Sequence, residues 1–339
     1  CVAEPVLASL GGGGFLLAKP VGQPALVYDF FPQTPAHKRP RREVDFFPIL
    51  ADFGEATQEF HIGMGAIATP GAIKGLFQIQ AELGRLPLAQ VITPACQLAR
   101  RGVRLNPFQH YIATIVEPIL RATPAALALH QADPDSDRLA REGERVRNPG
   151  LAATLEALAE EGAGLFYEGE LGERLSRDCE THGGHLRRQD LAAYRVEKRR
   201  PLSIRYRQCR LSTNPPPSLG GLLIAFTLSL LEETPLPEVP WGSAPHLIAL
   251  ATAIRLTQAM RRQSAIHLEL DRAEHQAHLD AELLAHYRRI MRQEARFSRG
   301  TTQISIADRA GNLASMTLSN GEGAGYVLPD TGIMLNYML

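Results

Sequence analysis

The sequence lacks a net charge and any long apolar run, and each absence argues against a class of protein. Its 36 basic and 36 acidic residues cancel, so no overall field draws the molecule toward nucleic acid or an anionic membrane. A charged residue or a proline interrupts every apolar stretch before it reaches the length of a membrane span. We therefore expect no nucleic-acid partner and no membrane span within these residues.

Cysteine is also scarce, with four residues at positions 1, 96, 179 and 209. None belongs to a CxxC pair or to a His/Cys pattern with the spacing of metal ligands. Scattered cysteines in a chain of this size are more often small buried apolar side chains than disulfides. The cysteines therefore predict no metal site and do not define a cellular compartment.

Two local clusters favour structural interpretations. The glycine run at residues 11–14 precedes the strand-like residues 15–18, whereas a phosphate-binding glycine loop follows a strand and opens a helix. No lysine follows at P-loop spacing, so we reject a nucleotide site. The basic cluster at residues 37–42 is short and interrupted by proline, which favours a solvated loop over a phosphate site.

Apolar periodicity predicts a chain that is helical in its middle and contains strands toward both ends. The sequence shows no internal repeat and no clear domain boundary. Three prolines at 215–217 predict a rigid extended loop, with Ser218 as the N-cap of the next helix. We expect strands at 15–18, 25–31 and 204–211, and helices at 72–83, 88–101, 108–127, 150–161, 167–180, 190–194, 222–231, 247–260 and 281–292.

A β-hairpin is predicted near the end of the sequence, with strands at 302–307 and 313–317 joined by a turn at 308–312. Gly300 and Thr301 stand just before its first strand. One interpretation is an ordinary hairpin that begins with threonines. The other is a threonine nucleophile that becomes a new chain N-terminus after cleavage. On the hairpin alone the ordinary interpretation is favoured, because short motifs often match by chance.

An ordered series of short motifs changes this balance. The motifs are SLGGGGF (9–15), TPG (69–71), GRLP (84–87), TPA (93–95), FYEG (166–169), GHL (184–186), DLAAY (190–194), PPPSLGG (215–221), TTQ (301–303) with GN (311–312), and GIMLN (332–336). Together they resemble the γ-glutamyltranspeptidase family of N-terminal-nucleophile hydrolases. Each motif is weak by itself, but the set keeps the family order from the first residues to the last.

The resemblance implies an α+β fold, an αββα four-layer sandwich in which helices cover both faces of two stacked sheets. It divides the chain into residues 1–300, a helix-rich portion of a large subunit, and residues 301–339, the start of a small subunit. We expect the two parts to form one structural domain. Relative to the family, we expect both ends of the sequence to be incomplete.

The resemblance also implies a reaction. The Thr301 hydroxyl attacks the Gly300 carbonyl to give an ester, and water opens it to free Thr301 as a new N-terminus. Threonine needs an adjacent base, and the freed α-amine, with an unperturbed pKa of about 7.7–8.0, supplies one. No histidine partner, metal or organic cofactor is then required. The expected substrate is a γ-glutamyl or other amide, with water or an amine as acceptor.

Other site residues follow from matching positions in the family pattern. Ser319 and Asn320 match positions that contact the nucleophile and the substrate amine, although Ser319 replaces the more usual Thr and Asn320 depends on an assumed one-residue gap. The alternative is that they form only a turn. Thr302 and Thr317 are candidate supports of the nucleophile, and the alternative for Thr302 is an ordinary strand position.

The sequence departs from the family pattern where the acyl group should be recognised. The family has an Arg that grips the α-carboxylate, and Phe31 stands in its place, so it cannot make a bidentate contact. Either a nearby cation at 38, 39, 41 or 42 replaces that Arg, or the acyl group lacks the carboxylate. Gln303 stands where many members have His, and residues 337–339 lack an acidic contact. The alternatives to a γ-glutamyl enzyme are an acylase for another acyl group and a catalytically impaired homologue.

Overall fold

A five-stranded antiparallel sheet lies at the centre of the computed structural model, which describes residues 1–53, 57–234, 236–263, 279, 281–291, 302–319 and 323–336. The predicted hairpin is confirmed and forms one edge of this sheet. β1, the first strand of the chain, pairs with β11 on one side and with β2 on the other. Residues about 300 positions apart in sequence therefore become neighbours. The strand order is β10 (Thr302–Ala307), β11 (Leu313–Ser319), β1 (Gly13–Lys19), β2 (Leu26–Phe30) and β7 (Glu197–Arg199).

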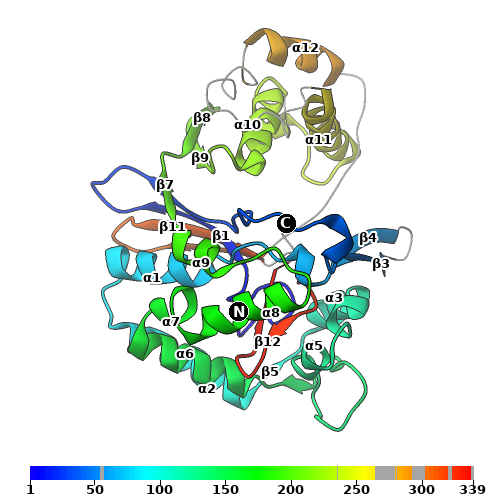
Figure 1. The fold of residues 1–339 in the computed structure, drawn as a ribbon. Coiled ribbons are helices and arrows are strands. Elements are labelled where there is room, and N and C mark those ends of the chain that lie inside the picture. The colour runs from blue at the N-terminus through cyan, green and yellow to red at the C-terminus, as the bar shows by residue number, and fades with distance from the viewer. Residues whose placement is uncertain are drawn as a thin grey trace.

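One face of the sheet is covered by helix α1 (Ala72–Leu83), as Figure 1 shows. Leu16, Tyr28 and Phe30 point toward it and are almost fully buried. Alternate residues of a strand point to opposite faces, so these side chains form one apolar surface. Burial of each large side chain contributes about 1.5–3 kcal/mol, which fixes α1 against the sheet.

Further helices pack beyond α1 around a core that contains Tyr167 and Tyr194, whose rings stack with centroids 5.7 Å apart. Asn106, Thr123 and Asn148 cap the N-termini of three of them through side-chain oxygens. The helices are α2 (Leu88–Arg101), α3 (Pro107–Ile115), α4 (Glu117–Leu120), α5 (Pro124–Ala128), α6 (Pro149–Glu161), α7 (Gly164–Tyr167), α8 (Glu170–Thr181) and α9 (Arg188–Ala193).

A second group of elements lies on the other side of the central sheet from α1 (Figure 1). It has its own apolar core, in which Phe226 and Tyr287 meet edge to face with ring centroids 5.5 Å apart. Its elements are β8 (Leu202–Tyr206), β9 (Cys209–Thr213), α10 (Leu219–Leu231), α11 (Ala244–Gln263) and α12 (Ala281–Met291). The remaining strands form short antiparallel pairs: β3 (Phe47–Asp52) with β4 (Thr57–Ile62), β5 (Val103–Arg104) with β6 (Arg145–Val146), and β12 (Val327–Leu328) with β13 (Ile333–Met334).

The glycine run before β1 serves close backbone packing. A Cβ on Gly11 would lie 2.3 Å from the Met334 carbonyl oxygen, and one on Gly14 would lie 1.9 Å from that of Thr317. Side chains at these positions would push the neighbouring chains apart. The Gly12 carbonyl also accepts hydrogen bonds from the first amides of α1.

Two sequence predictions of local structure are wrong, and a third, the N-cap at Ser218, is confirmed in its position. The predicted strand at 204–211 is a hairpin, because Arg207 adopts a left-handed conformation with φ of 54° and its amide donates to Glu232. The predicted helix at 108–127 is three short helices, since Pro118 and Pro124 open new helices. Ser218 does stand at the N-cap of α10, but its side chain makes no capping hydrogen bond.

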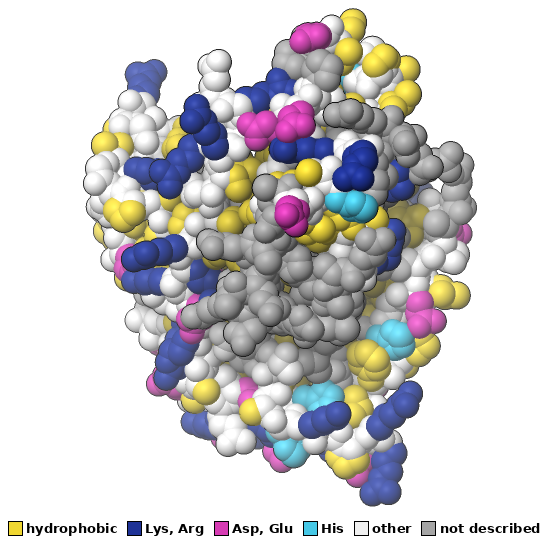
Figure 2. Space-filling model, turned by 90° about the horizontal axis from the view of Figure 1, so that it is seen from above, with side chains coloured by type: hydrophobic (Ala, Val, Ile, Leu, Met, Phe, Trp, Pro, Cys, Tyr) yellow, Lys and Arg dark blue, Asp and Glu magenta, His cyan; other side chains and the backbone are white. Residues whose placement is uncertain are grey.

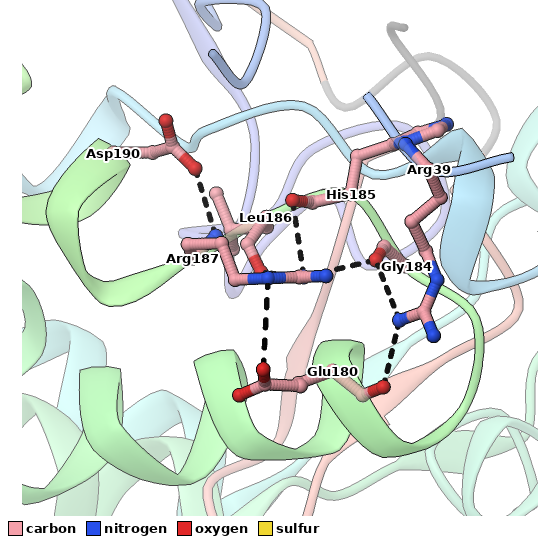
Figure 3. A network of polar contacts seen from close by, with 7 residues as sticks. All are labelled: Arg39, Glu180, Gly184, His185, Leu186, Arg187 and Asp190. Carbon is pink, nitrogen blue, oxygen red and sulfur yellow. Dashed lines mark hydrogen bonds and ion pairs between the residues drawn. The ribbon is translucent and has the colours of Figure 1, made fainter. Parts of the chain in front are cut away.

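The basic cluster at 37–42 is solvated only in part. Arg41 and Arg42 are exposed, but Arg39 is half-buried. Its guanidinium donates to the Glu180 carbonyl at 2.7 Å, and in Figure 3 it converges with Arg187 on the Gly184 carbonyl. On the face shown in Figure 2, acidic and basic side chains lie among one another.

Candidate active site

The candidate active site lies at one end of the central sheet, where β10 begins and β11 ends. Thr302 pairs with Leu318, and the next residue, Ser319, pairs with Gly13. Gly14 pairs with Phe30, the last residue of β2, so β2 finishes at the same end of the sheet. The register therefore brings the start of β10, the hydroxyl of Ser319 and the residues after β2 to one end of the sheet.

Ser319 and Thr317 share the sheet face that points away from α1. Phe15 is the register partner of both Thr317 and Asp29, and residues directly opposite each other in a sheet point to the same face. Ser319 lies two residues beyond Thr317 and therefore belongs to the same face. The register thus places two of the predicted site residues on the same face as Phe15 and Asp29.

A pocket of about 450 Å³ opens beside this row of residues. This volume lies within the range of small-molecule sites. The loop before α10 forms one wall, so both groups of elements contribute to the pocket. Its lining includes Phe15, Asp29, Phe31, Glu197, Arg199 and Ser218.

Phe31 forms part of the pocket wall, and its backbone is held on both sides. Its amide donates to an Asp29 carboxylate oxygen at 3.1 Å, and its carbonyl accepts from the Tyr194 hydroxyl at 3.0 Å. Burial raises the pKa of Tyr194 far above its ordinary value, so this hydroxyl stays protonated and remains a donor. The Phe31 ring stacks on Phe15, with centroids 5.5 Å apart and planes inclined by 21°.

Sequence reasoning missed the ion pair that borders this wall. The Arg199 Nε atom lies 2.7 Å from an Asp29 carboxylate oxygen, and their side chains are only 16% and 9% exposed. Arg199 ends β7, the strand that pairs with β2 at Asp29 through Glu197. Asp29 was visible in the sequence beside Phe30 and Phe31, but no local pattern indicated that Arg199 would reach it.

The cations that the sequence offered as replacements for the family Arg do not line this pocket. Arg39 instead contacts α8 and the residues after it, as described above. Among the described residues that line the pocket, Arg199 is the one cation. Of the predicted site residues, Thr317 and Ser319 are described, Thr302 is placed by its backbone pairing, and Gly300, Thr301 and Asn320 lie outside the described residues.

A buried asparagine, Asn336, holds together chain segments that adjoin the start of β1. Asn336 donates to the Gly11 carbonyl at 2.8 Å and to the Ala68 carbonyl at 3.0 Å, and it accepts from the Ala68 amide at 3.2 Å. It thereby ties the chain after β13 to the glycine run and to the segment before α1. The sequence marked Asn336 as the end of a motif but did not indicate this anchoring role.

In the described part of the chain, no three His, Cys, Asp or Glu side chains gather in a way that would hold a metal ion. No helix within these ranges combines the length and the apolar character needed to cross a membrane.

Two solved structures have a fold similar to that of this chain. Cephalosporin acylase from Bacillus halodurans matches with a TM-score of 0.76 at 23% identity, over 99% of this chain and 62% of that one. Gamma-glutamyltranspeptidase from Helicobacter pylori matches with a TM-score of 0.68 at 22% identity, over 88% and 83%. The fold is therefore that of the N-terminal-nucleophile hydrolases, and the expected α+β class is confirmed.

The family follows from the sequence itself. The family model for gamma-glutamyltranspeptidase matches residues 1–339, and the chain belongs to this family. Glutathione hydrolase proenzyme of Escherichia coli (strain K12) is 28% identical over 367 residues. Acylase ACY 1 proenzyme of Pseudomonas sp. (strain V22) is 30% identical over 359 residues. Each alignment covers 99% of this chain but only 59% and 62% of the relative, so the chain spans about three fifths of their length.

Proposed function

We propose that this chain is part of a threonine amidohydrolase or acyltransferase that cleaves itself between Gly300 and Thr301. It would then transfer or hydrolyse a γ-glutamyl or related acyl group through an ester on Thr301. The observation that carries the proposal is the sheet register. Ser319 and Thr317 lie near the open end of the β10–β11 hairpin, opposite its turn. They share the sheet face that carries the pocket-lining Phe15 and Asp29.

The proposed reaction uses the hydroxyl and the freed α-amine of Thr301, the acyl substrate, and water or an acceptor amine. The Thr301 oxygen attacks the acyl carbonyl while its proton passes to the freed α-amine of the same residue. The amine of the substrate leaves with that proton, and an ester remains on Thr301. Water or an acceptor amine then attacks the ester and restores the hydroxyl. Ser319 would donate a hydrogen bond within this centre, and Asn320 would bind the substrate.

The proposal includes the organisation of the chain. Residues 1–300 would remain as part of a large subunit and residues 301–339 as the start of a small one, within one structural domain. Both relatives named above are described as proenzymes, which supports such processing. The strand pairing of β11 with β1 supports it too, because seven register pairs would hold the two products together after cleavage.

A second candidate is an acylase for an acyl group other than γ-glutamyl. The observation that favours it is Phe31, which lines the pocket where the family pattern has an Arg. One of the two relatives named above, Acylase ACY 1 proenzyme, is itself described as an acylase, which also supports this candidate. Both candidates use the same nucleophile and differ only in the group that fills the pocket.

Intact-mass measurement of the complete protein tests the proposal. We expect two fragments that meet at Gly300 and Thr301, and the Thr301→Ala variant should remain one chain. Wild-type protein should hydrolyse an anilide substrate, and Thr301→Ala should lose this activity. Ser315→Ala serves as the control, because it removes a hydroxyl from the same strand at a position outside the predicted site, and it should still split.

Each outcome separates the candidates. Folded wild-type protein that never splits would refute the enzyme proposal and leave the catalytically impaired homologue. Splitting together with hydrolysis of a γ-glutamyl anilide supports the first candidate. Splitting with hydrolysis of other acyl anilides but not the γ-glutamyl one supports the second.

A further inference from the structure

We propose that the pocket beside Phe15 and Phe31 binds an uncharged, apolar acyl side chain and disfavours one that ends in a carboxylate. This inference rests on the proposed function and specifies its substrate class. It concerns the described pocket of about 450 Å³ at the end of β1 and β2.

The wall of the pocket is aromatic and held in place. Phe15 and Phe31 stack with centroids 5.5 Å apart, and the Phe31 ring remains 41% exposed. The backbone of Phe31 is bound on one side by Asp29 and on the other by Tyr194. A partly exposed ring that is fixed in this way offers an apolar surface without an ordering cost when a ligand binds.

The charges of the pocket oppose an anionic group. Arg199 is the cation of the described lining, and it is already paired with Asp29 at 2.7 Å. Glu197 lies in the same lining, which therefore holds two carboxylates and one guanidinium. A ligand carboxylate would have to compete with Asp29 for Arg199 and would also meet the charge of Glu197. An uncharged acyl group meets neither obstacle.

The position of the pocket fits the side chain of an acyl group. Ser319 lies on β11, β1 is the next strand, and Phe31 follows the end of β2. Neighbouring strands are about 4.8 Å apart, so two strand spacings, on the order of 10 Å, separate the two positions. An acyl chain of four carbons with a terminal phenyl ring, as in a 4-phenylbutanoyl group, has about this length.

The test compares four anilides with the complete protein: γ-glutamyl, glutaryl, hexanoyl and 4-phenylbutanoyl. We expect kcat/KM for the 4-phenylbutanoyl anilide to exceed that for the glutaryl anilide at least tenfold. Phe31→Arg supplies a guanidinium at the wall and should shift this ratio toward glutaryl by tenfold or more. Phe31→Leu keeps an apolar wall and should preserve the wild-type ranking.

Phe47→Arg is the matched control, because Phe47 is 44% exposed and lies in β3, outside the pocket lining. It should leave the ratio unchanged. Self-cleavage of each variant, measured by intact mass, reports that it has folded.

A wild-type protein that splits but prefers the glutaryl or γ-glutamyl anilide would overturn the pocket assignment and leave the proposed function intact. An equal shift of the ratio in Phe31→Arg and Phe47→Arg would also overturn it. Absence of both splitting and anilide hydrolysis would overturn the proposed function, and this inference with it.

Discussion

Replacement of Asn336 by Ala tests how much one buried side-chain amide contributes to the free energy of unfolding. The Asn336 side chain is fully buried and connects three segments that are distant in sequence. Ala removes its donors and its acceptor. The Ala68 carbonyl and amide then lose their bonds to this side chain, whereas the Gly11 carbonyl keeps a 3.3 Å bond from the backbone amide of residue 336.

The expected loss follows from these contacts. A buried polar group left without a partner costs about 1–3 kcal/mol, and one further hydrogen bond is worth about 1 kcal/mol. With two such groups and one such bond, we expect Asn336→Ala to lower the free energy of unfolding by about 3–7 kcal/mol. Asn336→Asp keeps the size of the side chain but lacks the amide donors, so it should not restore stability.

Urea unfolding followed by circular dichroism measures this loss. The Thr301→Ala precursor is the suitable background, because a chain that does not split keeps one reference state. Asn106→Ala is the control, since Asn106 is an exposed helix cap and its loss should cost only about 1 kcal/mol. A loss below about 1 kcal/mol for Asn336→Ala, or full stability in Asn336→Asp, would refute the reasoning.

Two further predictions concern packing and pH. In Gly13→Ala the new Cβ would lie 2.4 Å from the Phe30 carbonyl oxygen, so we expect a loss of about 3 kcal/mol in the same urea assay, whereas Gly164→Ala, with no atom within 4 Å, should cost nothing. Hydrogen bonding to Arg138 lowers the pKa of Glu144 from 4.5 to about 2, so its stabilising effect is present above pH 4.5 and is lost as pH falls toward 2. Arg138→Ala should raise this pKa toward 4.5 in an NMR titration; an unchanged pKa would contradict the assignment.

Local signals in the sequence were sufficient for the helices that end at glycines. The predicted helices at 72–83 and 88–101 have the bounds observed for α1 and α2, and each is followed by a glycine. Their apolar periodicity and their C-terminal glycines lie within the segment itself. The hairpin of β10 and β11 was predictable for the same reason, because its alternation and turn residues are local.

Contacts between distant segments could not be predicted in this way. The turn at Arg207 depends on Glu232 and on the Thr234 carbonyl, which lie beyond the next helix. Local alternation through 204–211 therefore predicted one continuous strand. The ion pair of Arg199 with Asp29 is another such case, since 170 positions separate its members and only the β2–β7 pairing brings them together.

The backbone around the proposed acyl pocket is held independently of the Phe31 side chain. The Gly11–Gly14 contacts, the Asn336 hydrogen bonds and the pairing of β1 with β11 hold the sheet end without any contribution from the side chain at position 31. The Phe31 backbone is likewise held through its amide and carbonyl, which any residue type except proline would present. A change of side chain at this position therefore alters the pocket wall while the surrounding hydrogen bonds persist. We therefore expect Phe31→Arg to change the ranking of acyl substrates while self-cleavage continues.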